Sequence, residues 1–192
     1  MFHYLLCYYH LTIRSSQNAP FIFVTNDGGT PEQIKADILS KELDIEAQGD
    51  FVFASHTPFK QLGETYQHDR VLFVGKKREY TSAIAESCGF KNYVLLEDFA
   101  AQHPLLCPWN KYDTAPVHDD QRIKAIFMTH EPVDWAEGLQ VLCDILLSAG
   151  HLDTQQYRDS WRHHSQIPIY IANPDFTYSA QVYLHDMYVF WT

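Results

Sequence analysis

Residues 20–30 read Pro-Phe-Ile-Phe-Val-Thr-Asn-Asp-Gly-Gly-Thr, and this stretch decides the fold that we expect for the chain. The four apolar residues at 21–24 are aromatic or β-branched, which is typical of a parallel strand buried on both faces. The apolar run ends at Thr25 and Asn26, so both should lie at the carboxyl end of the strand, where open α/β sheets bind their ligands. The two glycines that follow let a backbone approach an anion closely. An ordinary strand–turn–helix corner gives the same pattern, so the motif alone leaves both interpretations open.

A helix is expected directly after the glycines. Thr30 has the side chain of a helix N-cap, Pro31 suits the first helical position, and Gln33 would complete a capping box. Ile34 and Ile38 lie one helical turn apart and are expected to face inward. The N-terminus of such a helix can also receive an anion.

The rest of the chain alternates between strand patterns and helix patterns. Strands are expected at residues 51–54, 71–75, 93–96, 123–128 and 167–172, and helices at residues 31–43, 79–88 and 134–148. Residues 102–121 contain three prolines and no periodicity, which predicts a long loop. The alternation predicts an α/β fold with mostly parallel sheets.

The last of these helices has a clear apolar stripe. The stripe is formed by Trp135, Leu139, Leu142 and Leu146. Residues at this spacing are typical of core packing rather than of a cofactor site. We expect residues 123–172 to fold as a strand–helix–strand unit, with the stripe facing its sheet.

The composition limits the class of protein. Of the 192 residues, 46% are hydrophobic and 15% are aromatic, which is enough for a packed core. The formal net charge of −10 argues against nucleic acid and against an anionic membrane as partners. The four cysteines form no CxxC pair, which favours reduced intracellular thiols over disulfides or a zinc site. No apolar run in the sequence is as long as a membrane span.

Few motifs in the chain carry chemistry. His130-Glu131 begins like a zinc-protease motif, but Pro132 follows and the fifth position is not a histidine. The sequence has no GxGxxG, no GxxxxGK(S/T) and no GxSxG motif. The informative positions are therefore two strand ends, Thr25-Asn26 and the Asn-Pro-Asp of residues 173–175, where short polar side chains follow an apolar strand.

Four segments of the chain, in this order, resemble the class IIA group of haloacid dehalogenase (HAD) superfamily hydrolases. They are residues 21–29, 55–59 (Ser-His-Thr-Pro-Phe), 71–75 and 171–175. Within the group, the chain is most similar to the cat-eye-syndrome critical region type, a mitochondrial branch of fungi and animals. The resemblance extends over residues 19–181, and its first two segments are the most specific.

The resemblance implies a partial Rossmann-like HAD core with an inserted α/β cap domain and mostly parallel sheets. Residues 1–60 would be the partial core, residues 61–181 mainly the cap and its connections, and residues 182–192 an atypical C-terminal tail.

The resemblance also implies roles for single residues. Thr25 and Asn26 match the segment that holds the transferring phosphoryl group. Asn173 and Asp175 match an Asn-Pro-Asp turn that faces the substrate.

The same resemblance shows which groups are missing from this chain. In the family, an aspartate attacks phosphorus, a second aspartate acts as general acid and base, and Mg²⁺ and a lysine neutralise charge. The nucleophile would precede Phe21, yet residues 1–20 contain no Asp or Glu. The lysine and a late acidic pair would follow residue 181. We therefore expect a phosphatase-type hydrolase that is incomplete at both ends and inactive, with no catalytic residue, no metal ligand and no bound Mg²⁺.

The resemblance implies a small phosphorylated metabolite as the partner and the mitochondrion as the location, whereas the residues alone would favour the cytoplasm. Neither nucleic acid nor a membrane is expected as a partner, and a homodimer is left open. A catalytically dead binding or dimerisation module that keeps the cap fits the same residues. A flavodoxin-like redox protein shares only the α/β alternation.

Overall fold

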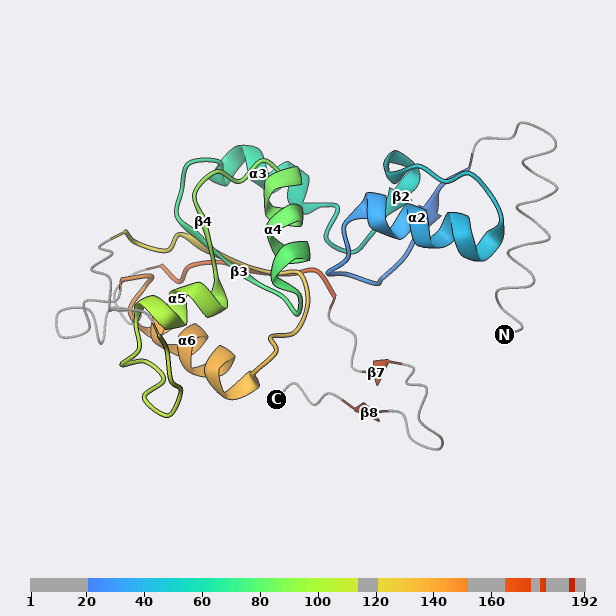
Figure 1. The fold of residues 1–192 in the computed structure, drawn as a ribbon. Coiled ribbons are helices and arrows are strands. Elements are labelled where there is room, and N and C mark those ends of the chain that lie inside the picture. Colours follow the sequence, from blue (N-terminus) through green and yellow to red (C-terminus); the bar gives the residue numbers. More distant parts are fainter. Residues whose placement is uncertain (1–20, 114–120, 152–164, 174–176, 179–186, 189–192) are drawn as a thin grey trace.

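The computed structural model describes residues 21–113, 121–151, 165–173, 177–178 and 187–188 (Figure 1). These residues form a small unit around a two-stranded sheet and a larger unit around a four-stranded sheet. Figure 1 shows the small unit, with helix α2, beside the larger one. No helix among the described residues is long and apolar enough to cross a membrane.

The elements follow one another in the expected α/β order. The small unit contains β1 (Phe23–Val24), α2 (Glu32–Leu43), a 3₁₀ turn (Gly49–Phe51) and β2 (Val52–Phe53). The larger unit contains α3 (Phe59–Tyr66), β3 (Val71–Val74), α4 (Arg78–Ser87), β4 (Tyr93–Leu95), α5 (Leu96–Gln102), β5 (Ala125–Met128), α6 (Trp135–Leu147) and β6 (Ile169–Ile171). An antiparallel pair, β7 (Thr177–Tyr178) and β8 (Met187–Tyr188), comes last. Helices α3 and α5 have no counterpart among the expected elements.

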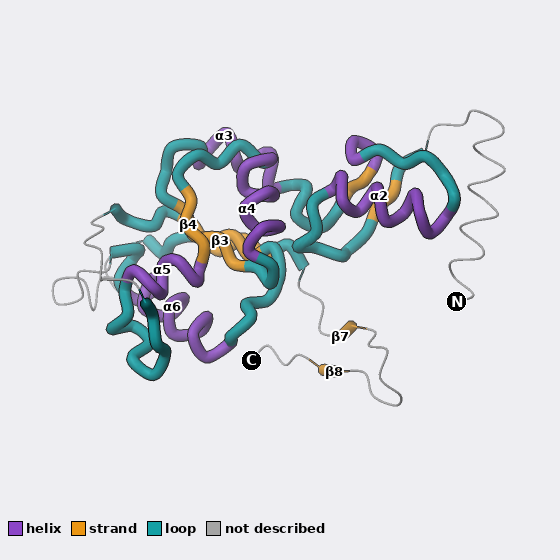
Figure 2. Tube along the Cα trace, in the orientation of Figure 1, coloured by secondary structure: helices purple, strands orange, loops and turns teal. Residues whose placement is uncertain are grey.

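The larger sheet is parallel and is covered on both faces. Its strand order is β4-β3-β5-β6. Helices α3 and α4 cover one face, and α5 and α6 cover the other (Figure 2). In β3, Val71 and Phe73 pack toward α3 and α4, whereas Leu72 and Val74 pack toward α5 and α6. The predicted α/β fold with mostly parallel sheets is confirmed.

The small sheet is parallel as expected, but β1 is not buried on both faces. Val24 is 75% exposed, and Phe53, its partner in β2, is 43% exposed. Phe23 and Val52 face α2 and pack around Ala36. The expectation was wrong because, within the described residues, α2 covers only one face of this sheet.

The start of α2 also differs from the expectation. The helix follows Pro31, and no side chain caps its N-terminus. Gln33 does not close a capping box but accepts a hydrogen bond from the Gly49 amide at 3.2 Å. Ile38 is 41% exposed, because the inward face of the helix is centred on Ala36.

The expected strand–helix–strand unit is present, since β5 and β6 are parallel neighbours and α6 packs on their sheet. Of the predicted stripe, Leu142 is buried and Leu146 packs against the core, but Leu139 is 51% exposed. Val141 and Ile145 are buried in its place. Apolar residues stand at helical spacing on both sides of Leu142, so the periodicity alone did not identify the inward side.

We expect Leu142→Ala to lower the free energy of unfolding by about 2–5 kcal/mol, because the truncation leaves a cavity in the core. Leu139→Ala, on the exposed side of the same helix, is the matched control and should change it by less than about 0.5 kcal/mol. Urea denaturation measures both values. Equal losses in the two variants would contradict the observed orientation of α6.

Candidate functional site

The candidate site is the loop of residues 25–30, which connects β1 to α2. The Thr25 amide donates a hydrogen bond to the Phe53 carbonyl at 3.0 Å, which fixes the start of the loop beside the end of β2. The Thr25 hydroxyl accepts a hydrogen bond from the Asp27 amide at 3.1 Å. Thr25 is half-buried and Asn26 is exposed. Both follow β1 directly, so the predicted position at the carboxyl end of this strand is confirmed.

Two glycines allow the loop to touch the larger unit. A Cβ atom on Gly28 would lie 2.6 Å from the Thr129 carbonyl oxygen and 2.7 Å from the Ser55 hydroxyl oxygen, so a side chain does not fit there. Gly29 has a φ of +76°, and a Cβ atom on it would lie 2.9 Å from the His130 ring. The loop therefore lies against the carboxyl ends of β2 and β5.

The end of β6 meets the same loop. The Ala172 Cβ lies 3.8 Å from the Cβ position of Gly28, and the Ala172 amide donates to the Met128 carbonyl at 2.9 Å. Asn173 comes next and is half-buried. The structure thus brings the strand end that carries Asn173 to the loop, whereas Asp175 lies outside the described residues.

Charged side chains of both signs surround the loop. Lys35 of α2 forms an ion pair with Asp27. At the ends of β3 and β5, Lys76 Nζ lies 3.7 Å from Glu131 Oε1, and His130 Nδ1 lies 2.5 Å from Glu131 Oε2. Because the His130 ring also packs on the loop, these three residues lie at the edge of the candidate site.

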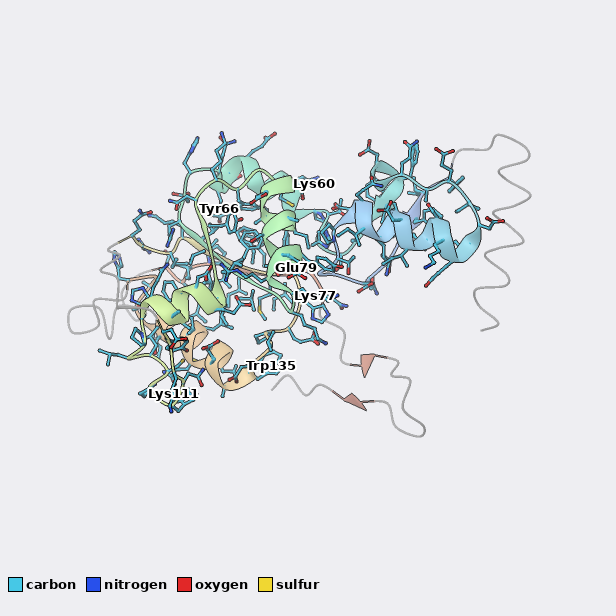
Figure 3. All side chains as sticks on the ribbon, viewed as in Figure 1. Lys60, Tyr66, Lys77, Glu79, Lys111 and Trp135 are labelled. Carbon is cyan, nitrogen blue, oxygen red and sulfur yellow. The ribbon has the colours of Figure 1, made fainter. Side chains whose placement is uncertain are left out.

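A buried carboxylate links the two units next to the loop. Glu32, in the first turn of α2, is 6% exposed. Lys60 Nζ lies 2.9 Å from its Oε1, the Thr57 hydroxyl donates to the same oxygen at 3.1 Å, and His56 Nε2 lies 3.5 Å from Oε2. Lys60 belongs to α3 and lies on the side of the larger unit that faces α2 (Figure 3).

The environment of Glu32 keeps it charged. Burial by itself raises the pKa of this carboxyl group. The contacts with His56 and Lys60 outweigh burial, and the pKa of Glu32 lies well below the usual range of a glutamate. The two units are therefore joined by an ionised, almost fully buried carboxylate.

Sequence reasoning missed Glu32, Ser55 and Thr129 as parts of this site. Ser55 stands in the Ser-His-Thr-Pro-Phe segment that carried the resemblance, so a signal for it existed. Glu32 and Thr129 belong to no motif, since their importance comes from contacts with residues distant in the sequence. In the part of the chain that the structure describes, no three His, Cys, Asp or Glu side chains gather in a way that could hold a metal ion.

Comparison with known sequences identifies one family. Residues 10–91 match the family model of haloacid dehalogenase-like hydrolases. The chain is 28% identical to a mitochondrial hydrolase of Saccharomyces cerevisiae, over 86% of this chain and 48% of the relative. It is 31% identical to a cardiolipin synthase (CMP-forming)/mitochondrial hydrolase fusion protein of Schizosaccharomyces pombe, over 70% of this chain and 24% of the relative. The chain thus spans less than half the length of either relative.

Solved structures give the same fold. A possible sugar phosphatase of the HAD superfamily from Cytophaga hutchinsonii superimposes with a TM-score of 0.59 at 15% identity, over 94% of this chain and 52% of that one. A hypothetical protein from Pyrococcus horikoshii superimposes with a TM-score of 0.51 at 13% identity, over 91% of this chain and 53% of that one. At such low identity these similarities show the fold alone.

We expect Glu32→Gln to destabilise the protein by about 2 kcal/mol at pH 7, because the amide oxygen still accepts hydrogen bonds but lacks the negative charge that strengthens them. The pKa of Glu32 is lowered in the folded state, so its contribution is full above the pKa of an unfolded glutamate, about 4.3, and is lost as the pH falls below that value. Urea denaturation should therefore show a difference between wild type and variant that shrinks from pH 7 to about pH 3.5.

Glu64→Gln, an exposed position on α3, is the control and should show almost no difference at any pH. A loss in Glu32→Gln that stays constant over this pH range would contradict an ionised carboxylate at position 32.

Proposed function

We propose that this chain, which belongs to the haloacid dehalogenase-like hydrolases, binds a small phosphorylated molecule at the carboxyl end of β1. The observation that carries the proposal is the contact of Gly28 with the ends of β5 and β6. It puts a glycine-containing loop where parallel sheets bind ligands, and backbone amides of such loops bind anions.

Thr25 and Asn26 are the phosphate-binding residues in this proposal. The Thr25 hydroxyl accepts a hydrogen bond from the Asp27 amide, but a hydroxyl that accepts one bond can donate another. Thr25 can therefore donate to a phosphoryl oxygen. Asn173 and Asp175 would face the remainder of the substrate from the end of β6.

The proposal extends to the organisation of the chain. Residues 1–60 would form a partial core, residues 61–181 mainly a cap domain, and residues 182–192 a tail. The substrate would then bind between the two units. Two relatives are named as mitochondrial hydrolases, which supports the mitochondrion as the location.

Hydrolysis in the family needs groups that we do not find in this polypeptide. Residues 1–20 contain no Asp or Glu that could attack phosphorus ahead of β1. The described residues also lack a set of ligands for Mg²⁺, the ion that neutralises charge in the family. The action that we propose for this polypeptide is to bind and orient a phosphoryl group, without turnover at an enzymatic rate.

Titration with inorganic phosphate, followed by calorimetry, tests the binding site. Thr25→Val removes the hydroxyl at nearly constant size and should weaken binding by about fivefold or more, because a hydrogen bond to a charged oxygen is lost. Thr65→Val, at an exposed position of α3, is the control and should bind as the wild type does. The wild type should not hydrolyse p-nitrophenyl phosphate in the presence of Mg²⁺. Metal-dependent turnover that Thr25→Val abolishes would contradict the proposed lack of activity.

A binding module that associates with a second copy of itself is the second candidate, and the outer face of the β1–β2 sheet favours it. Ile22, Val24 and Phe53 are 58%, 75% and 43% exposed on or beside these strands. Parallel sheets are normally covered on both faces. Face-to-face packing of two copies would remove this apolar surface from water.

If the second candidate is right, the wild type should dimerise with rising concentration, and Val24→Lys should be monomeric because a charge enters the interface. Val133→Lys is the matched control, since Val133 is 71% exposed but lies in the larger unit. Analytical ultracentrifugation distinguishes the two states. A wild type that stays monomeric at all concentrations would exclude this association.

A further inference from the structure

Strand β6 (Ile169–Ile171) lies at one end of the four-stranded sheet. Among the described residues its only neighbouring strand is β5, so its other edge is free. The Ile126 amide of β5 donates to the Pro168 carbonyl at 3.0 Å, and the Ala172 amide donates to the Met128 carbonyl of β5 at 2.9 Å. Positions 168 and 172 therefore bond to β5.

These two bonds determine which backbone groups face the free edge. In a parallel pair, every second residue of a strand bonds to the same neighbour. Tyr170 stands between positions 168 and 172, so its backbone groups also point to β5. The amides and carbonyls of Ile169 and Ile171 point the other way, and no hydrogen bond joins them to a described residue. Four backbone groups are thus left for a partner.

The side chains at the free edge are apolar and exposed. Tyr170 packs on the side of the sheet that α3 and α4 cover, where its ring stacks on Phe127 with 5.0 Å between the centroids. Side chains alternate along a strand, so those of Ile169 and Ile171 lie on the other side. They are 37% and 46% exposed there, whereas the side chains of β3 and β5 are buried.

The free edge of β6 lacks the features that usually prevent pairing. Exposed edge strands commonly carry a lysine, a proline or a bulge. The three residues of β6 include no lysine or proline and pair with β5 in a regular register, and residues 165–173 contain no charged residue. At the opposite end of the same sheet, Val94 and Leu95 of β4 are buried. The edge of β6 is therefore suited to pairing with a further strand.

We propose that the free edge of β6 binds an extended segment of another protein, which adds to the sheet as a further strand. The backbone groups of Ile169 and Ile171 form the hydrogen bonds to this segment. Every second side chain of the segment packs beside the two isoleucines, so these side chains are apolar and β-branched. The proposal does not rest on phosphate binding, because β6 pairs through groups that the loop of residues 25–30 does not use.

Charge favours a partner of different sequence over a second copy of this chain at β6. The net charge of −10 makes two copies repel each other, and residues 165–173 offer no charge that could offset the repulsion. A segment with lysine or arginine beside its apolar residues is attracted by the same net charge. The partner that fits is an extended, β-branched segment with basic residues at its ends.

A synthetic peptide tests the proposal. It contains three valines that alternate with three threonines, and it has a lysine and a blocking group at each end. We expect the full chain to bind it, and amide hydrogen exchange at Ile169 and Ile171, measured by NMR, to slow by about tenfold or more. The Tyr170 amide bonds to β5 and should exchange slowly with and without peptide. The same peptide with every backbone amide N-methylated is the control and should not slow exchange.

Two variants locate the binding on the edge. Ile171→Pro removes one outward amide but leaves the bonds to β5 in place, and should weaken peptide binding by about tenfold or more. Ile169→Lys places a positive charge against the basic peptide and should have the same effect, so it gives the answer even if Ile171→Pro does not fold. Val133→Lys, at a position that is 71% exposed elsewhere in the larger unit, is the matched control and should bind as the wild type does.

Three results would overturn the proposal. The first is a wild type that does not bind the peptide at millimolar concentration. The second is binding that N-methylation or both edge variants leave unchanged, because the peptide would then not pair with β6. The third is slow exchange at Ile169 and Ile171 in the chain alone, which would show that a second copy or another part of the chain occupies the edge.

Discussion

The arrangement of the molecule depends on one close approach, that of Gly28 to the Thr129 carbonyl. Thr129 is itself held firmly, because its amide and its hydroxyl both donate to the Val74 carbonyl, at 2.9 Å and 3.1 Å. Gly75, which follows Val74, also has no room for a side chain, since a Cβ atom there would lie 2.2 Å from the Thr81 hydroxyl oxygen. Gly28, after β1, and Gly75, after β3, thus let the carboxyl ends of β1, β3 and β5 come together. The position of the candidate site follows from this steric constraint.

Comparison of the two sheets shows that the burial of a strand depends on how many faces of its sheet are covered by helices. The apolar runs at residues 21–24 and 71–74 look alike in the sequence. The second run is β3, which has helices on both faces, and its four residues are fully buried. The first run has α2 on one face only, so alternate residues are exposed. A strand pattern predicts the strand, but the number of covering layers decides its burial.

The sequence predicted most elements because glycines mark their ends. Gly89 and Gly150 follow α4 and α6 with φ values of +88° and +85°, the conformation that stops a helix. Helix α3 was missed because Gly63 interrupts its pattern, yet this glycine is needed, since a Cβ atom on it would lie 1.7 Å from the Cys88 carbonyl oxygen. Thr25 and Asn26 could be predicted as site residues because they directly follow an apolar strand pattern. The contacts of Glu32 could not be predicted from a sequence pattern, because the residues that it contacts stand 24 to 28 positions further along the chain.

The two candidate functions are physically connected through Asn26. Exposure alternates over residues 21–26, which include β1: Phe21, Phe23 and Thr25 are half-buried, whereas Ile22, Val24 and Asn26 are exposed. Thr25 therefore belongs to the side that packs on α2, and Asn26 belongs to the apolar outer face. A second copy on that face would cover Asn26 but would leave the Thr25 hydroxyl on the other side. Association would then alter phosphate binding only through Asn26, so the contribution of this residue, rather than that of Thr25, shows whether the two functions compete.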